Sequence, residues 1–190
     1  MRPNRATNSY HTLRQLFVSA KSAESTRGLL RAGNLIMPCA IGRTGMRALK
    51  REGDGASPCG AWPLREAYYR ADRLRFRPRT SLPLRALSPE DGWCDAAGDR
   101  NYNRHIQHPY YGNAERLWRE DGLYDIVVVV GYNDLPRIKG RGSAIFIHVA
   151  RTGADGLDLE PTEGCVALQK GDLLRLLPIL CSQTRLLIGI

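Results

Sequence analysis

The sequence predicts a mostly β protein, a mixed β-sandwich or barrel-like sheet with minor helices. Many short apolar stretches alternate with turns, and the 190 residues include 19 Gly and 11 Pro. Strand-like segments do not alternate with long helical ones, as they would in a parallel βαβ sheet. The length and the hydrophobic fraction of 43% suit one globular domain with a sizeable core.

The first 26 residues are polar and basic, and we interpret residues 1–26 as a flexible basic tail before a domain over residues 27–190. The apolar part of this tail is too short and too interrupted for a signal-peptide core. No stretch of the chain approaches the length of a membrane span. No signal peptide is therefore visible in the sequence.

The first half of the domain predicts strands joined by structured loops. A hairpin is expected over residues 28–41. A strand with aromatic content follows over residues 62–70, and Pro63 favours an edge position for it. Residues 93–107 lack periodicity, which predicts a long structured loop flanking a cleft.

The second half contains the strongest strand signal. Residues 114–119 suggest one helical turn. Residues 123–131 read LYDIVVVVG, which predicts a central strand buried on both faces because β-branched residues dominate. A short helix over residues 173–177, ended by Pro178, and a closing strand over residues 184–190 complete the prediction.

The chemistry is expected where the next apolar run, residues 144–147, ends in His148. Alternation along this strand places the imidazole where the strand leaves the core. A Gly-rich acidic loop then leads to Gly164 and Cys165. A thiol and an imidazole on neighbouring strand ends suit a Cys–His nucleophilic pair, with Cys165 as nucleophile and His148 as base. The backbone amide of Gly164 would face the oxyanion.

This segment resembles the catalytic motif of the L,D-transpeptidase (YkuD-type) domain, a His followed after a loop by Ser/Thr-x-Gly-Cys. Here the motif is His148 and then TEGC at residues 162–165. The segment SPCGAW at residues 57–62 is similar to the family's Thr-Pro-x-Gly-x-Phe turn. Residues 92–95 and 99–103 look like those of a subgroup of short, single-domain members. The resemblance covers about residues 28–190.

Two positions depart from many relatives, which have His before the motif Gly and Arg or Asn two residues after the Cys. Here these positions are Glu163 and Ala167. The nucleophile and the base are unaffected, whereas a substrate-contacting role of these two positions is not implied.

The resemblance implies a bacterial acyltransferase of cell-wall biogenesis or degradation and of cell shape. Cys165 would attack a peptidoglycan tetrapeptide stem, release D-alanine and hold a thioacyl group, which an amine on another stem would accept. Water as acceptor would make the protein an L,D-carboxypeptidase. The resemblance also implies that the backbone carbonyl of Val149 orients His148, and it calls for no metal or organic cofactor.

We expect further substrate contacts from four residues. Arg151, three positions after His148, is expected to pair with a stem-peptide carboxylate or to lie in water as a loop residue. Tyr132 and Asn133 follow the predicted central strand and are expected to be ligand contacts or plain turn residues. Thr162 belongs to the motif itself. The resemblance places the protein in the periplasm or cell envelope, with the cytoplasm as the alternative because no signal peptide is visible.

Two other classes of function stay open, a non-catalytic peptidoglycan-binding module and a basic polyanion binder. The net charge of +9 suggests affinity for anions. No nucleic-acid motif is present, so no nucleic acid is expected as a partner. Arg residues crowd together over residues 65–85, as a solvated strand edge or as a rim that attracts anionic substrate. The oligomeric state is not indicated.

The cysteines other than Cys165 are expected to be buried small hydrophobic residues. The chain has five Cys, which are widely spaced and include no Cys-x-x-Cys, so neither a disulfide framework nor a zinc site is indicated. The four expected core cysteines are Cys39, Cys59, Cys94 and Cys181.

Overall fold

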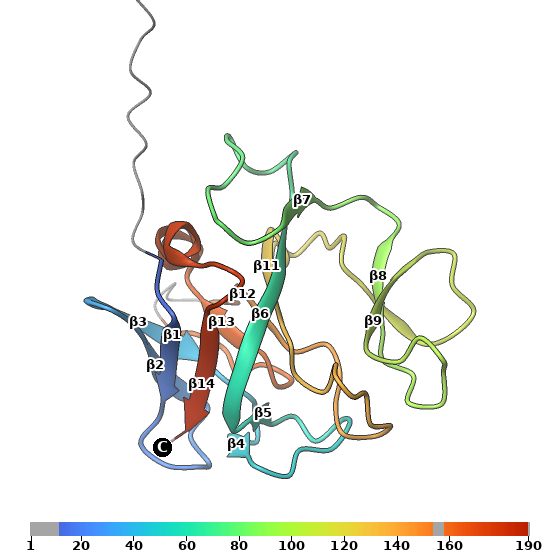
Figure 1. Cartoon of the computed structure of the whole chain (residues 1–190), viewed down its shortest axis with the longest axis horizontal. Helices are drawn as coiled ribbons and strands as arrows, with labels where there is room; N and C mark the ends of the chain where they lie inside the picture. Colours follow the sequence, from blue (N-terminus) through green and yellow to red (C-terminus); the bar gives the residue numbers. More distant parts are fainter. Residues whose placement is uncertain (1–11, 154–157, 190) are drawn as a thin grey trace, which may run out of the picture.

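Strand pairing closes most of the chain into a barrel, which Figure 1 shows beside a smaller sheet. The structure is a computed structural model that describes residues 12–153 and 158–189. In this part of the chain the large sheet has the order β11-β12-β13-β3-β2-β1-β14-β6-β7, and β11 also pairs with β6, which closes it. The predicted mostly β, barrel-like fold is therefore confirmed.

The bounds of the elements follow the alternation of apolar segments and turns. The strands of the large sheet are β1 (Gln15–Ser19), β2 (Arg27–Ala32), β3 (Leu35–Ala40), β6 (Gly60–Tyr69), β7 (Leu84–Ala86), β11 (Ile126–Val130), β12 (Phe146–Val149), β13 (Val166–Leu168) and β14 (Arg185–Gly189). The short strands β4 (Met46–Arg47) and β5 (Ser57–Pro58) pair with each other. The small sheet has the order β10-β8-β9, with β8 (Asp91–Cys94), β9 (Arg104–Gln107) and β10 (Ala114–Arg116).

The prediction of a flexible tail over residues 1–26 is wrong for residues 15–19, because these form β1. This strand pairs with β2 and with β14, and Leu16 and Val18 are buried in the barrel. Its apolar residues alternate with exposed ones, which is the period of a strand with one face on the core. Residues 1–11 of the predicted tail lie outside the described residues.

The expected edge position of the strand around Pro63 is also wrong. Strand β6 lies between other strands, with β14 paired to its first residues, β7 paired to its last residues, and β11 paired along residues 64–69. Pro63 has no amide hydrogen to donate to a neighbouring strand. It lies at the end of the β14 pairing, where it is matched with Arg185 and its carbonyl accepts from Gly131.

The predictions of a long loop over residues 93–107 and of a helical turn over residues 114–119 are wrong. The first segment includes β9 and the end of β8, and the second begins with β10. Strand β8 pairs with β9 and with β10, so residues 91–116 form a small antiparallel sheet at one side of the barrel (Figure 1). Asn103 turns the chain between β8 and β9 with a φ of 55°. The strands have four residues or fewer, too short for a strand period to be visible in the sequence.

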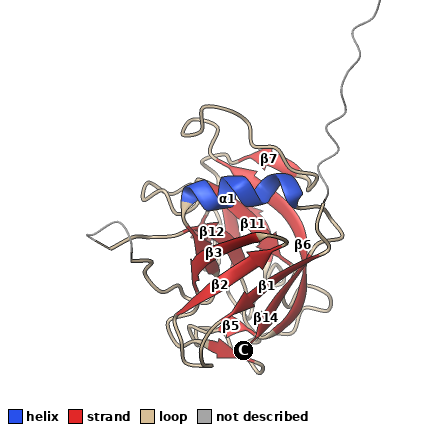
Figure 2. Ribbon diagram, turned by 90° about the vertical axis from the view of Figure 1, so that its left-hand side faces the viewer, coloured by secondary structure: helices blue, strands red, loops and turns tan. Residues whose placement is uncertain are grey.

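The helix near the C-terminus is α1 (Lys170–Leu176), continued by a 3₁₀ turn at Leu177–Ile179. Figure 2 shows α1 lying across one end of the barrel. Leu173 and Leu176 are completely buried in the barrel core. Helix α1 has seven residues, and no helix in the described ranges has the length and hydropathy of a membrane span.

The central strand is buried on both faces, as predicted, because a separate apolar cluster covers each face. Val128 and the other even-numbered residues of β11 face the barrel core, whereas Val127 and Val129 face a second cluster outside the barrel. The second cluster also contains Phe146, and aromatic residues of the small sheet and its loops cover it. This outer cluster, rather than the barrel core, includes the sulfur of Cys165.

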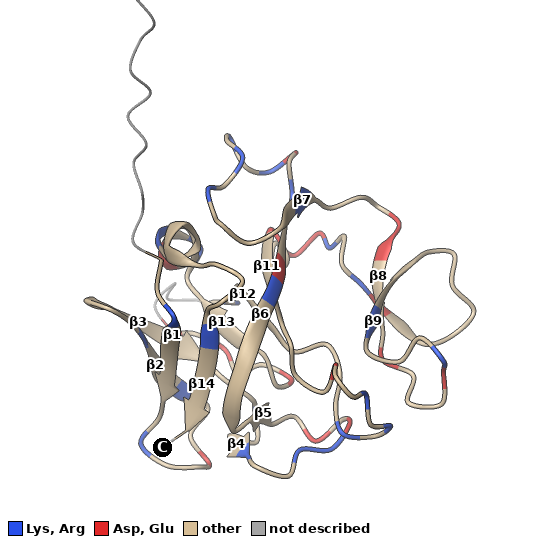
Figure 3. Cartoon of the chain, viewed as in Figure 1, with Lys and Arg blue, Asp and Glu red and all other residues tan. Residues whose placement is uncertain are grey.

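The Arg residues of the 65–85 segment hold loops together. Arg70 is buried, with its guanidinium 3.6 Å from the ring centre of Trp118 and hydrogen-bonded to Asp72. Arg73 and Arg85 form ion pairs with Asp125 and Asp91, respectively. Figure 3 shows that basic and acidic residues are interspersed over the molecule. These contacts favour a structural role for this Arg-rich segment over a rim that collects anions.

Candidate active site

The imidazole lies on β12 and the thiol directly before the neighbouring parallel strand β13, and local pairing brings the two to the same face. Strands β12 and β13 are matched as Ile147 with Val166 and His148 with Ala167. Cys165 directly precedes β13, and the amide of Phe146 in β12 donates a hydrogen bond to its Sγ at 3.3 Å. Cys165 and His148 therefore both belong to the outer face of the barrel wall.

The Cys165 thiol is held by backbone groups on both sides. Its Sγ donates to the carbonyl oxygen of Ala144 at 3.2 Å and accepts from Phe146. Ala144 has a φ of 53°, in the left-handed region that residues with a side chain rarely adopt. The chain enters β12 through this strained residue, and its carbonyl is thereby turned toward the sulfur.

The His148 ring is oriented by its own strand. Nδ1 lies 2.8 Å from the carbonyl oxygen of Val149. A carbonyl oxygen can only accept, so Nδ1 carries the hydrogen and, in the neutral ring, Nε2 has a free lone pair. The ring of Tyr124 packs edge-on against the imidazole, with ring centres 5.3 Å apart. The neutral tautomer set by these contacts is the one that can take a proton at Nε2.

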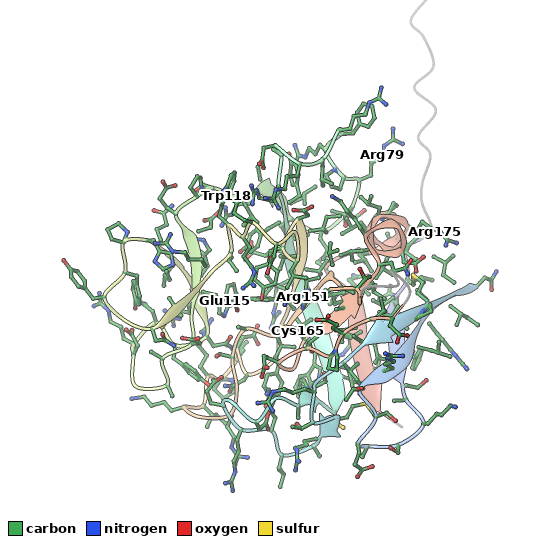
Figure 4. All side chains as sticks on the ribbon, turned by 180° about the vertical axis from the view of Figure 1, so that it is seen from behind. Arg79, Glu115, Trp118, Arg151, Cys165 and Arg175 are labelled. Carbon is green, nitrogen blue, oxygen red and sulfur yellow. The ribbon has the colours of Figure 1, made fainter. Side chains whose placement is uncertain are left out.

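Cys165 and His148 border one cavity of about 380 Å³. Cys165 is 8% exposed and His148 is 6% exposed, so both lie at its buried floor. Figure 4 labels three of the residues that border this cavity, Cys165, Arg151 and Glu115. The remaining charged residues of the cavity wall come from four separate segments, and they are Lys50, Glu52, Asp95, Arg119, Glu160 and Glu163.

Burial favours the uncharged form of both reactive groups. Burial, the main cause, and the Glu115 carboxylate together raise the pKa of the Cys165 thiol to about 12, although the hydrogen bond from Phe146 lowers it. Burial lowers the pKa of the His148 imidazole to about 4, although the hydrogen bond to Val149 raises it. At neutral pH the pair in this structure is a thiol and a neutral imidazole.

The turn that carries the thiol is closed by hydroxyl groups. Thr162 Oγ1 accepts from the amide of Gly164 at 3.1 Å and donates to the carbonyl of Cys165 at 2.7 Å. Ser57 Oγ lies 2.8 Å from the Gly164 carbonyl and accepts from Gly42. The Gly164 amide, expected to face an oxyanion, is thus engaged within the turn, because it donates to the Thr162 hydroxyl.

The four expected substrate contacts have different positions. Arg151 and Thr162 border the cavity, but Arg151 is paired with Asp121 at 3.2 Å and the Thr162 hydroxyl is used in the turn. Tyr132 and Asn133 are not among the residues found around the cavity, so the expectation that they contact a ligand is not supported by their placement.

Tyr132 and Asn133 are structural residues of the loop before β12. The Tyr132 ring packs edge-on against Trp62 in the barrel core, with ring centres 4.8 Å apart. Asn133 has a φ of 48°, and its side-chain amide donates to the carbonyls of Ile138 and Gly142. Both side chains are thus used to close the loop, which is the turn role that the sequence left open.

Several cavity residues were missed by the sequence analysis. Tyr124 contacts the His148 ring, and its hydroxyl donates to Glu115 at 2.7 Å. Glu52 accepts from Ser143 at 2.8 Å and from the Tyr102 hydroxyl. The available signal for Glu52 was the run of charged residues around Gly53.

The two departures from the motif have local explanations. Glu163 projects toward solvent and pairs with Arg43, whose Nε lies 2.8 Å from the carboxylate. Ala167 is buried in a small apolar cluster with Ala40 and Ala150, and it lies opposite His148 in the β12–β13 pairing. A small residue at 167 leaves room beside the imidazole.

The cysteines other than Cys165 differ in burial. Cys39 and Cys94 are buried, as expected, whereas Cys59 and Cys181 are partly exposed. All five thiols are free. Part of the predicted Gly-rich loop between His148 and Cys165, residues 154–157, lies outside the described residues.

Comparison with known proteins agrees with the motif and with the fold. The model of the YkuD family, the L,D-transpeptidase catalytic domain, matches residues 16–188, which includes all but the first residue of β1 and the last residue of β14. A comparison with curated proteins found no match. The family is in general cysteine-dependent and acts on peptidoglycan. Because the match covers nearly the whole chain, the protein belongs to the L,D-transpeptidase catalytic domain family.

Proposed function

We propose that the protein is a peptidoglycan L,D-transpeptidase with Cys165 as nucleophile and His148 as general acid and base. The observation that carries this proposal is the pair's common position at the floor of one cavity, with Nδ1 of His148 bonded to Val149. That bond leaves Nε2 as the proton acceptor. The role proposed for Val149 belongs to its backbone carbonyl, which accepts the bond from the ring.

In the first step, Nε2 takes the thiol proton and Sγ attacks the carbonyl carbon of the bond before a terminal D-residue. The Sγ–H bond to Ala144 is lost, while the Phe146 amide remains as a donor to the sulfur. His148 then gives the proton to the departing amine of D-alanine, and a thioester stays on Cys165. In the second step, an amine of a neighbouring stem displaces Sγ, which recovers its proton.

The raised pKa of Cys165 and the lowered pKa of His148 suit a proton transfer from the thiol to the imidazole that happens only while the sulfur attacks the substrate. Neither group is charged before substrate binds, so the cavity does not hold a standing thiolate–imidazolium pair. We propose the cell envelope as the place of action, since peptidoglycan lies there. If water accepts the acyl group instead, the same residues act as an L,D-carboxypeptidase.

Intact-protein mass spectrometry after incubation with a carbapenem or a tetrapeptide stem tests the function. The expected result is a covalent adduct that Cys165→Ala abolishes and that His148→Ala slows by about a hundredfold or more. Cys181→Ala is a matched control, because it removes a partly exposed thiol that is not among the cavity residues. It should form the adduct like the original protein.

An adduct that persists in Cys165→Ala contradicts the proposal. Analysis of the tetrapeptide products separates the acceptors, since an amine acceptor yields a crosslinked peptide and water yields a tripeptide. Binding of peptidoglycan without any adduct would favour a non-catalytic module. A salt-sensitive shift of nucleic acid without an adduct would favour a polyanion binder.

A further inference from the structure

The cavity wall contains a buried lysine that the motif does not include. Lys50 is 3% exposed, yet it borders the same cavity as Cys165. A lysine side chain is seldom so deeply buried unless its charge has a partner or a purpose. It lies in the loop between β4 and β5, far from the nucleophile in sequence.

Two glycines form a slot for the Lys50 side chain. A Cβ on Gly142 would lie 2.8 Å from Lys50 Cε, and a Cβ on Gly164 would lie 3.3 Å from Lys50 Nζ. Both glycines have positive φ, 103° and 134°, which side chains disfavour. The methylene stem therefore passes over Gly142, and the ammonium rests against Gly164, the residue directly before Cys165.

The ammonium is held in this slot by Asp54. Lys50 Nζ lies 2.6 Å from Asp54 Oδ1. The same carboxylate accepts from the amides of Arg51 at 2.7 Å and Ala56 at 3.0 Å. Burial acts to raise the pKa of Asp54, but these amides and Lys50 lower it below its usual value. Because Asp54 is itself fixed, the position of the positive charge is fixed as well.

The charges around the Cys165 sulfur are mostly unfavourable for a thiolate. The neutral His148 ring and the Tyr124 hydroxyl face the same region, and the Glu115 and Glu163 carboxylates raise the pKa of the thiol. Lys50 is the ammonium that opposes them, and it lowers the pKa of the thiol. Arg119 and Arg151 also border the cavity, but each is paired with Asp121.

From this geometry we infer that Lys50 is an electrostatic activator of Cys165, a positioned positive charge that stabilises the sulfur as its negative charge develops. The inference rests on the proposed role of Cys165 as nucleophile. An ammonium fixed in a dry slot costs no reorganisation at the moment of attack, which makes it effective. Asp54 moderates this effect, because its opposite charge lies against the ammonium.

Alkylation of Cys165 tests the inference without any peptidoglycan. Iodoacetamide is neutral and iodoacetate is anionic; in both cases an S–C bond forms and iodide leaves. The rate at Cys165 is measured by peptide mass spectrometry as a function of pH. In Lys50→Met, alkylation by iodoacetamide at pH 8 should be about tenfold slower, since the thiolate loses a nearby positive charge. The preference for iodoacetate relative to iodoacetamide should also fall.

Lys170→Met is the matched control. Lys170 is also paired with a carboxylate, Asp125 at 2.7 Å, and its loss changes the net charge by the same amount. It is not among the residues around the cavity, so both alkylation rates should stay within about twofold of the original. Asp54→Asn should have the opposite effect to Lys50→Met, because it leaves the ammonium without its counter-charge.

A purely structural role of the ion pair predicts different results. It would change the rates of both reagents equally, and Lys50→Met and Asp54→Asn would shift them in the same direction. Either result, or an unchanged rate in Lys50→Met, overturns the inference. If Lys50→Met does not fold, the double variant Lys50→Met/Asp54→Asn removes both buried charges, and its iodoacetate preference should still fall. A transpeptidase assay that fails while these ratios hold would contradict only the proposed function.

Discussion

The two faces of the β11–β12 wall differ in what they bury. The barrel face is an apolar core to which Ile147 contributes, and residues from nearly every strand of the large sheet complete it. The outer face, to which the next residue of the strand, His148, points, contains Cys165 and Tyr124 beside buried polar groups such as His148 itself. One strand thus contributes to the barrel core on one side and to the proposed active site on the other, because successive side chains point to opposite faces.

The small sheet buries the outer face and with it the proposed Cys–His pair. A barrel wall without a cover would leave the outer face in water, and neither reactive group would have its pKa shifted by burial. Strands β8–β10 and their loops supply Trp93 and Leu117, which cover Phe146 and its neighbours. The site is therefore formed between a rigid wall and a smaller, loop-rich layer.

The largest expected effect on stability comes from the barrel face. Ile147→Ala should lower the free energy of unfolding by about 2–5 kcal/mol, because it leaves a cavity in a fully buried core. Urea unfolding measures the change. Ile147→Val, which removes one methylene, should cost only about 1 kcal/mol. A loss in Ile147→Ala no larger than in Ile147→Val would show that this face is loosely packed.

A smaller, pH-dependent effect on stability is expected from His148, which follows Ile147 in β12 and lies on the outer face. The pKa of His148 is about 4 in the folded protein and about 6.5 when unfolded, so only the unfolded state takes up a proton between these values. Stability should therefore fall as the pH drops from about 6.5 to 4. This residue accounts for about 3 kcal/mol of the loss, because each pKa unit corresponds to about 1.4 kcal/mol.

His148→Gln removes the titrating group and serves as the comparison. Its free energy of unfolding should fall less over the same pH range than that of the original protein, as measured by urea unfolding at several pH values. Equal slopes for the two proteins would mean that the imidazole is accessible to water and titrates normally in the folded state.

The smallest expected effect concerns the polar contact beside the imidazole. Tyr124→Phe keeps the ring against His148 but removes the hydroxyl that donates to Glu115. Stability should fall by about 1 kcal/mol, the typical net value of one hydrogen bond. Thermal unfolding measures it. A loss several times larger would indicate that the hydroxyl also organises the neighbouring charges of the cavity.

Local sequence was enough to single out the proposed Cys–His pair and to predict the central strand. His148 ends a continuous apolar run, and Cys165 follows a glycine, so both signals lie within a few residues. The burial of β11 on both faces was predicted for the same reason, since Val127 to Val130 leave no polar side. Short strands such as β8 and β10 were missed, because three or four residues show no reliable period.

What the sequence by itself determined is the β-rich class, the motif and the identity of the groups that could react. Only the tertiary structure decided which residues surround them. Lys50 and Glu115 are more than 45 positions from Cys165 in the chain, yet they border its cavity, whereas Tyr132, nearer in sequence, lies in the barrel core. The physical reason is that the register and the closure of the sheet bring distant segments to one face. Both depend on the pairing of all the strands together, so no local pattern encodes them.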